Sequence, residues 1–227
     1  MPNNRKNELE KTIIIRKFKS ADRKAVEHIH FETGLFGKSM SRYLTEIKEF
    51  DKQIAYYLER EPESIFVAES ENEVVGYLLG CLDDSKNDEI KSGLCRMFSV
   101  IFKIPFMPKK DRKYWWITTV RIIKIIFSGD ELFKLKTPNN AGHIHINLLP
   151  KYRGKGIGTY LLKEYIKYAK FKGAKRIHAG SYLTRLNPNK NFWKKNGFRE
   201  YIKVKSSLWE DFFPDEEMFV VFYLKEL

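Results

Sequence analysis

Residues 143–170 read HIHINLLPKYRGKGIGTYLLKEYIKYAK and join three different patterns without a break. The run from His143 to Leu149 is rich in branched residues, and Pro150 ends it because proline cannot donate a ladder hydrogen bond. Three alternate glycines follow in a basic turn. From Ile157 onward, apolar residues recur at threes and fours, with lysines on the opposite face. The stretch therefore predicts a strand, a glycine turn and a helix.

In that order, the free backbone N–H groups of the turn and the positive end of the helix point at one place, which favours an anion. Two common nucleotide motifs do not fit. No Gly-Lys-Ser/Thr follows at Walker A spacing, and the third glycine of a dinucleotide fingerprint would fall on Thr159 or Leu161. The spacing that fits is Arg-x-x-Gly-x-Gly, from Arg153 to Gly158, directly after Leu-Leu-Pro.

This motif resembles the pyrophosphate-binding motif of the GNAT superfamily of N-acetyltransferases. The resemblance implies acetyl-CoA as a co-substrate, with Gly156 and Gly158 letting the backbone approach the pyrophosphate. It also implies that backbone amides of the preceding strand hold the pantetheine arm and polarise the thioester carbonyl. The coenzyme-binding residues expected from these two segments are Ile146, Asn147, Leu148, Arg153, Gly154, Lys155, Gly156, Ile157, Gly158 and Thr159.

A second motif lies at residues 186–198, LNPNKNFWKKNGF. Asn187 suits a helix N-cap, Pro188 the first helical position, and Gly197 the residue after the helix. By the resemblance, this helix borders the pantetheine arm, which adds Asn187 and Trp193 to the coenzyme contacts. Trp193 stands where many family members carry a Tyr that protonates the leaving thiolate. An indole is no useful acid, although a thiol of pKa about 8.5 leaves tolerably as the thiolate.

The remaining patterns predict strands and helices in alternation, and hence an α+β protein with one sheet. Together with the resemblance, they predict a three-layer arrangement in which helices flank a mixed, mostly antiparallel sheet of the acetyltransferase type. We expect one domain over residues 1–227, with a helical insertion at 84–142 between the third and fourth strands. The expected strands are 12–18, 64–70, 73–83, 143–149, 176–183, 198–204 and 217–224, and the expected helices include 21–31 (capped by Ser20), 39–60 and 188–196.

The insertion contains two aromatic and apolar segments, Leu94 to Pro105 and Tyr114 to Phe127. A helix this apolar must be covered. The apolar helix could pack against any of three surfaces: its own domain, as a lid over the acceptor cleft; a second copy of the chain, giving a homodimer; or a membrane. Peripheral membrane contact through 94–127 is favoured by Lys109, Lys110, Arg112 and Lys113, which lie between the two segments.

Attack on a thioester requires a neutral amine, so some group must take the proton. His145 is the candidate base because it lies on the strand leading into the coenzyme site, and histidine titrates near neutral pH. His143 shares its face of the strand, and a structural histidine pair is the alternative. Ser181 and Tyr182 are candidates for a proton relay. The acidic residues before the last strand would attract a cationic amine or form a solvated loop; they are Glu210, Asp211, Asp215, Glu216 and Glu217.

The chain has a formal net charge of +13, but its Lys and Arg are spread from end to end and no nucleic-acid-reading motif is present, so no nucleic-acid partner is expected. Cys81 and Cys95 have no metal-ligand spacing, and no metal site is expected. Two cysteines and no signal peptide or apolar span predict a cytoplasmic protein. The leading hypothesis is an acetyl-CoA-dependent N-acetyltransferase acting on a primary amine. The alternatives are a noncatalytic acyl-CoA-binding module and, third, a nucleic-acid-binding protein.

Overall fold

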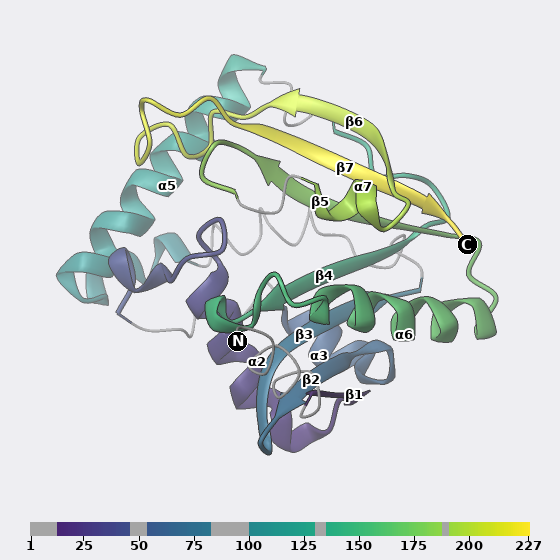
Figure 1. The fold of residues 1–227 in the computed structure, drawn as a ribbon. Helices are drawn as coiled ribbons and strands as arrows, with labels where there is room; N and C mark the ends of the chain where they lie inside the picture. The colour runs from purple at the N-terminus through teal and green to yellow at the C-terminus, as the bar shows by residue number, and fades with distance from the viewer. Residues whose placement is uncertain (1–12, 46–53, 83–99, 130–134, 188–190) are drawn as a thin grey trace, which may run out of the picture.

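The computed structural model of this chain describes residues 13–45, 54–82, 100–129, 135–187 and 191–227. Its strands form one seven-stranded sheet in the order β1-β2-β3-β4-β5-β7-β6 (Figure 1). All neighbouring strands are antiparallel except β4 and β5, so the predicted mixed, mostly antiparallel sheet is confirmed. The strands are β1 (Ile13–Lys17), β2 (Phe66–Ser70), β3 (Glu73–Cys81), β4 (Gly142–Leu148), β5 (Arg176–Leu183), β6 (Arg199–Lys205) and β7 (Phe219–Glu226).

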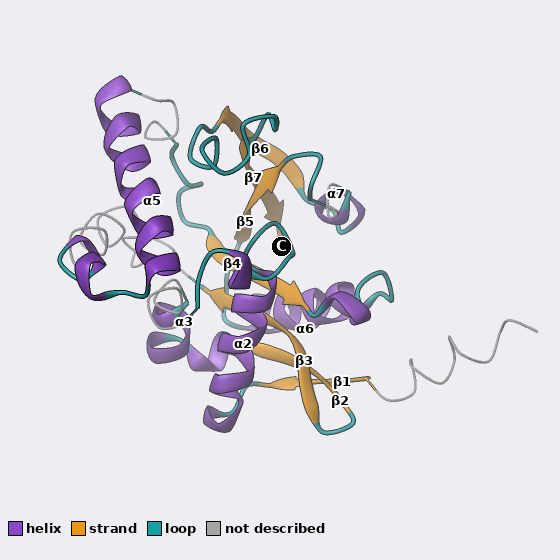
Figure 2. Cartoon of the chain, turned by 90° about the vertical axis from the view of Figure 1, so that its left-hand side faces the viewer, coloured by secondary structure: helices purple, strands orange, loops and turns teal. Residues whose placement is uncertain are grey.

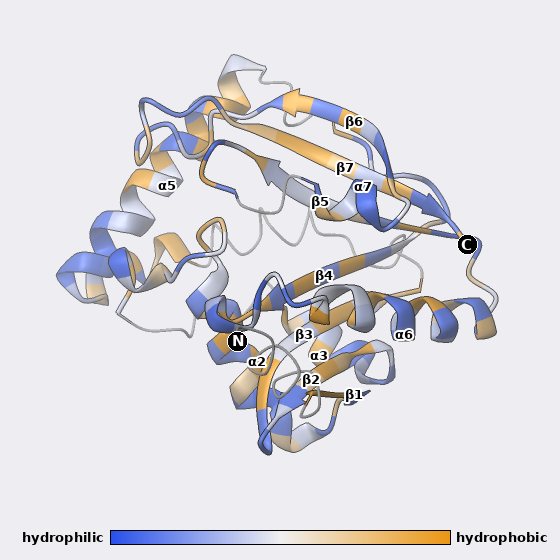
Figure 3. Ribbon diagram, viewed as in Figure 1, coloured by the Kyte–Doolittle hydropathy of each residue, from blue (hydrophilic) through white to orange (hydrophobic). Residues whose placement is uncertain are grey.

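Helices cover both faces of the sheet, which confirms the three-layer α+β class (Figures 1 and 2). Along β3 the side chains alternate, so that Tyr77 and Leu79 pack toward α2 and α3 while Leu78 packs toward α6. In Figure 3, β7 is largely apolar whereas α6 alternates between polar and apolar residues, as a helix with one buried face does. The α-helices are α2 (Arg23–Thr33), α3 (Ala55–Arg60), α5 (Lys109–Ser128), α6 (Ile157–Phe171) and α7 (Phe192–Lys195); the 3-10 turns are η1 (Ser20–Asp22), η2 (Met40–Arg42), η4 (Pro62–Ser64), η6 (Ile104–Phe106) and η8 (Pro150–Tyr152).

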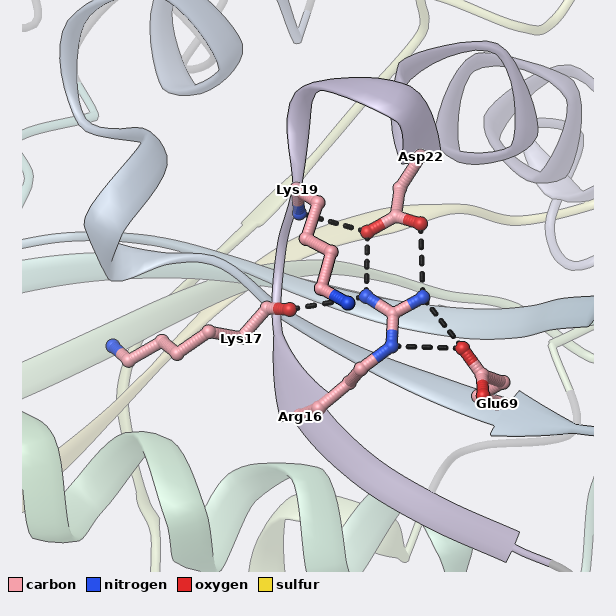
Figure 4. Close-up of polar contacts among 5 residues, drawn as sticks. All are labelled: Arg16, Lys17, Lys19, Asp22 and Glu69. Carbon is pink, nitrogen blue, oxygen red and sulfur yellow. Dashed lines mark hydrogen bonds and ion pairs between the residues drawn. The ribbon is translucent and has the colours of Figure 1, made fainter. Parts of the chain in front are cut away.

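Arg16 on β1 ties the first two strands to the start of α2 (Figure 4). Its guanidinium donates to both carboxylate oxygens of Asp22, at 2.6 and 2.9 Å, and to Glu69 on β2 at 2.8 Å. Asp22 also accepts from the backbone N–H of Lys19. The helical segment is therefore capped by a carboxylate reaching back from Asp22, and the predicted Ser20 cap is wrong because the cap residue is Lys19. The Arg16 bond holds the pKa of Asp22 below its usual value.

The single helix predicted over residues 39–60 is wrong in the part that the structure describes. The chain makes one 3-10 turn in η2, is not helical at Tyr43, Leu44 and Thr45, and resumes as α3; residues 46–53 lie outside the described residues. The apolar residues that suggested one helix face pack into two different clusters. Tyr43 packs against an aromatic cluster that includes Tyr114, whereas Ile54 and Tyr57 belong to the core beneath β3.

The insertion between β3 and β4 contains α5, which packs against its own domain at two places; residues 83–99, including much of the first apolar segment, lie outside the described residues. Near its start, Asp111 accepts from the backbone N–H and the hydroxyl of Thr45, at 2.8 and 2.6 Å. Further along, Arg121 pairs with Glu210 and Asp211 in the loop before β7. Figures 1 and 2 place α5 at the periphery of the molecule. Across the described parts of the chain, no helix is long and apolar enough to cross a membrane.

Candidate active site

The glycine turn leads from η8 into α6 and presents a row of backbone N–H groups. The backbone passes through left-handed φ angles at Gly154 (+73°) and Gly156 (+83°), which residues with a side chain rarely adopt. The five amides of residues 154–158 have no hydrogen-bond partner among the described residues, and the first amide taken up is that of Thr159, which donates to the Gly156 carbonyl. Successive free N–H groups at a positive helix end form an anion site.

Gly158 is required for a different reason, the close approach of three elements. A Cβ built on it would lie 3.2 Å from Cε2 of Phe192 on α7 and 3.6 Å from Cδ1 of Ile146 on β4. Around Gly156, in contrast, the nearest atom belongs to Tyr160 at 3.6 Å, so conformation and not crowding calls for glycine there. Ile157 is buried in the core, and Lys155 and Thr159 lie at the rim of the turn.

Beside this turn, β4 and β5 pair at only one end. Their register consists of Gly142 with Ile177 and His143 with His178, and beyond these residues the two strands separate (Figure 1). Each strand stays paired on its other side: β4 with β3 as far as Leu148, and β5 with β7 along its length. The sheet therefore opens between two strands that are each held in place from outside.

The backbone groups facing this gap follow from the hydrogen-bond alternation of antiparallel strands. The Leu149 N–H donates to Val75 of β3, so alternate residues, among them His145, use their backbone toward β3. The backbone groups of Ile146 and Leu148 consequently face the gap. An extended chain lying in the gap would meet these groups as it would meet a neighbouring parallel strand.

At the open end of the gap, two side chains donate hydrogen bonds to backbone carbonyls of β4 and β5. Arg153 donates from Nε to the Leu148 carbonyl at 2.8 Å, on the β4 side. Asn187 donates from Nδ2 to the Tyr182 carbonyl at 2.5 Å, on the β5 side, and to the Ser181 hydroxyl at 3.3 Å. Because a free strand edge is a template for wrong pairing, these two hydrogen bonds satisfy one exposed carbonyl on each strand edge.

At the closed end, three histidine rings lie together. The His143 ring stacks on that of His178 with centroids 4.6 Å apart, and lies 4.5 Å from that of His145. His143 shares a 2.5 Å hydrogen bond with Tyr57. Burial holds the pKa of His143 well below its usual value, with His145 and His178 adding to the effect, so His143 stays neutral and is a poor base. His145 is only partly buried and lies nearest the gap.

A series of hydrogen-bonded side chains also packs against this face of β4, and the sequence analysis did not predict it. Asn147 donates to the Tyr77 hydroxyl at 2.8 Å, and this hydroxyl lies 3.0 Å from Nδ1 of His30 on α2. Tyr77 is fully buried, and burial raises its pKa, so it remains a phenol. The sequence could have shown this contact only through the pairing of Tyr77 on β3 with Asn147 on β4. That pairing depends on the strand register, which the sequence does not give.

The tight turn after α2 crosses toward β5, and it was also missed. Phe36 adopts φ of +50°, an outlier for a bulky residue, and its ring lies 5.4 Å from that of Tyr182 in an edge contact. The adjacent Gly37 lies against the Arg153 guanidinium: a Cβ built on Gly37 would lie 2.9 Å from Nη1 of Arg153. The turn thus contacts residues from both sides of the gap. Its sequence signal was the Gly-Leu-Phe-Gly run at 34–37.

A family model described as the acetyltransferase (GNAT) family matches residues 33–198, which include the gap and the glycine turn. The chain belongs to the GNAT acetyltransferase family. Members of this family use acetyl-CoA as the acyl donor. No curated protein sequence matches the chain.

Solved structures share the fold at low sequence identity. A crystal structure named SsHAT is 21% identical with a TM-score of 0.63, and the match covers 95% of this chain and 98% of that one. The Drosophila melanogaster polyamine N-acetyltransferase is 12% identical with a TM-score of 0.60, covering 95% and 100%. The putative acetyltransferase yncA from Salmonella typhimurium, solved with acetyl-CoA, is 14% identical with a TM-score of 0.55, covering 95% and 94%.

In this GNAT chain, the predicted Asn-capped helix after β5 differs from the expectation. The cap residue of α7 is Asn191 and the helix covers Phe192 to Lys195, so the cap predicted at Asn187 is wrong; residues 188–190 lie outside the described residues. The Asn187 amide is drawn to β5 instead, because it satisfies a strand-edge carbonyl. Gly197 has φ of +79°, which confirms it as the residue that ends the helix.

Trp193 packs as a core residue of this GNAT domain. Only 6% of it is exposed, and its ring stacks on Tyr223 at 6.1 Å and contacts Phe198 at 5.1 Å. Its neighbour Phe192 is the α7 side chain that reaches toward β4 and α6. The position at which many family members carry a Tyr is therefore occupied here by a buried indole.

The acidic loop before β7 is engaged by the chain's own side chains. Glu210 and Asp211 pair with Arg121 of α5, which lowers the pKa of Asp211. Glu216 accepts from the Thr184 hydroxyl at 2.9 Å and pairs with Arg185, and the exposed Glu217 pairs with Lys205. These carboxylates hold the loop to α5, to the residues after β5 and to β6.

Proposed function

We propose that this chain is an acetyl-CoA-dependent N-acetyltransferase that acetylates a primary amine of a small molecule or peptide by direct transfer in a ternary complex. One observation carries the proposal. The row of free amides at residues 154–158, at the positive end of α6, opens onto the gap between β4 and β5. An anion-binding turn beside an unpaired strand edge suits a ligand that carries a pyrophosphate on an extended polar arm.

In this proposal the coenzyme is held mainly by backbone. The amides of Gly154 to Gly158 bind the pyrophosphate, with Lys155 adding positive charge at the rim. The backbone of Ile146 and Leu148 pairs with the amide-containing arm along the gap. A backbone amide of β4 then lies beside the thioester carbonyl and stabilises the oxyanion that develops there. Arg153 and Asn187 set the width of the entrance through their bonds to the two strand edges.

Acetyl-CoA supplies the thioester, and the chain's residues handle two protons. His145 takes the proton that the amine loses as it attacks; the neutral, buried His143 beside it acts as support and not as base. Tyr182 lies on β5 at the other side of the gap, and burial raises the pKa of its hydroxyl, so the hydroxyl stays protonated; in this proposal it is the candidate proton donor to the departing sulfur. Trp193 has no acidic proton to offer.

The proposal is tested in two steps with the full-length chain. Acetyl-CoA should raise the melting temperature, whereas NADH and short duplex DNA should not. Thiol release is then followed with polyamines, aminoglycosides, amino acids and peptides as acceptors. Turnover with any primary amine supports the enzyme. If saturating acetyl-CoA produces no shift, the coenzyme site itself is wrong.

A second candidate is a noncatalytic acyl-CoA-binding module, and the burial of Trp193 favours it. The indole is locked between Phe198 and Tyr223, so the side chain at this position neither donates an acidic proton nor turns toward the gap. A stabilising shift with acetyl-CoA, combined with no thiol release over the whole acceptor panel, would support this module over the enzyme.

A further inference from the structure

The outward face of α5 carries an apolar stripe whose side chains are exposed among the residues that the structure describes. Trp116, Ile123 and Phe127 are 59%, 40% and 86% exposed, and the half-buried Val120 completes a line with spacings of four, three and four residues. Such spacing keeps side chains on one helix face. The residues that hold α5 to the domain, Tyr114 and Ile125 among them, are buried on the opposite face.

Two more aromatic side chains extend this stripe beyond the start of the helix. Phe102 lies two residues before η6 and Phe106 is the last residue of η6, which packs beside α5; they are 79% and 89% exposed. Single exposed apolar residues are ordinary, but a contiguous aromatic patch on one peripheral helix indicates an interaction site. We call these four aromatic residues and one isoleucine the aromatic stripe; they are Phe102, Phe106, Trp116, Ile123 and Phe127.

Exposed cations surround the aromatic stripe. Lys109 and Lys113 continue its line toward the start of α5, and Arg112 and Lys124 lie on either side. Between residues 100 and 129 the sequence has a single acidic residue, Asp111, and this residue is buried and bonded to Thr45. Residues 100–129 therefore present aromatic rings and positive charge, and their one carboxylate is buried.

We propose that this face of α5 docks on an anionic membrane surface, with the aromatic stripe entering the headgroup boundary and the cations lying over acidic headgroups. An interfacial helix has this composition, in which aromatic residues sit at the boundary and Lys and Arg provide attraction to anionic lipid. A second copy of the chain fits less well. A twofold contact through α5 would place the same cations of two chains of net charge +13 against each other.

The test is cosedimentation of the full-length chain with vesicles of phosphatidylcholine alone and of phosphatidylcholine mixed with phosphatidylserine. The variant Trp116→Ser/Ile123→Ser/Phe127→Ser removes the exposed stripe on α5. The matched control is Phe171→Ser, which removes an 85% exposed aromatic residue between Lys170 and Lys172 at the end of α6. Melting temperatures and gel filtration establish that each variant is folded and in which oligomeric state.

We expect binding to the mixed vesicles and not to the neutral ones, weakened by added salt because the attraction is screened. The triple variant should lose at least about tenfold in affinity while Phe171→Ser retains it. The proposal is overturned if the wild-type chain ignores mixed vesicles, or if both variants bind alike. It is also overturned if the chain is a dimer that the triple variant converts to a monomer, since the stripe is then an interface between copies.

Discussion

The two ends of the gap between β4 and β5 are built from the same pair of strands and differ in almost every other respect. At the closed end, His143 and His178 are paired in the ladder, stacked and buried. At the open end the strands have separated, and the carbonyls that would have paired are taken up by Arg153 and Asn187. One end belongs to the core, and at the other end each strand edge has a carbonyl satisfied by a side chain.

The difference shows that position along the strand decides what a residue can do. His143 and His145 have the same chemistry and share one face of β4, but burial keeps the first neutral while the second lies partly exposed beside the gap. The left-handed glycines give a similar contrast, since Gly154 and Gly173 bracket α6 with φ of +73° and +83°. Only the first lies in a run of free amides.

The largest expected effect separates the histidines. His145→Ala should lower turnover by about a hundredfold while leaving acetyl-CoA affinity unchanged, because general-base catalysis typically contributes at least that factor. The matched change at the closed end, His178→Ala, should cost about 2 kcal/mol of unfolding free energy and leave turnover per folded molecule near that of the wild type. Steady-state kinetics and urea unfolding measure both. Equal loss of turnover in the two variants would erase the proposed distinction.

The next effect compares the two glycines. Gly154→Ala and Gly173→Ala place a side chain in the same left-handed conformation, with nothing within 4 Å of either built Cβ. Each should cost about 1 kcal/mol of stability. Only Gly154→Ala should also raise the dissociation constant for acetyl-CoA, by about tenfold, because it disturbs the amide row. Calorimetric titration decides, and matching affinities in the two variants would show that the turn does not bind the coenzyme.

Local patterns carried most of the fold prediction. Every predicted strand was found to within a few residues, because alternation, Pro150 and the glycine turn act over short distances. The prediction of one helix over 39–60 was wrong, because the periodicity of apolar residues indicates which residues are buried but not which cluster each one joins. Tyr43 and Tyr57 fit the same helical spacing but pack in different clusters.

The site was predictable only where its residues are consecutive. The turn from Arg153 to Gly158 was read directly, and its coenzyme role stays a prediction. The supports of β4 were not foreseen, since Asn147 meets Tyr77 across 70 positions of sequence and Tyr77 meets His30 across 47. The role of Asn187 was misassigned for the same reason: capping propensity is local, whereas the carbonyl it satisfies belongs to a strand edge created by the opening of the sheet.

A smaller effect should appear in the pH dependence of stability. The folded chain holds the pKa of His143 well below 6.5, whereas the unfolded chain protonates it normally. Between these two pKa values the unfolded state binds more protons, so the free energy of unfolding rises with pH. The slope is at most about 1.4 kcal/mol per pH unit for one proton, and the free energy of unfolding levels off above about pH 6.5. His143→Gln should remove this share of the slope. Urea unfolding near pH 7.5 and about pH 5.5 measures it, and an unchanged slope would contradict the assignment.

The smallest effect tests the edge bonds. Asn187→Leu removes the donor to the Tyr182 carbonyl, and Asn196→Leu removes a comparable amide-to-carbonyl bond, 2.9 Å long, from the residue after α7 to Phe192. Each should cost about 1 kcal/mol or less of stability. Only Asn187→Leu should speed amide hydrogen exchange along the open half of β5, because that edge loses the hydrogen bond from Asn187 to the Tyr182 carbonyl, and acetyl-CoA should reverse the change by occupying the gap. If both variants exchange alike with and without acetyl-CoA, the open end is held by the surrounding packing, and the contrast between the two ends of the gap does not depend on its edge bonds.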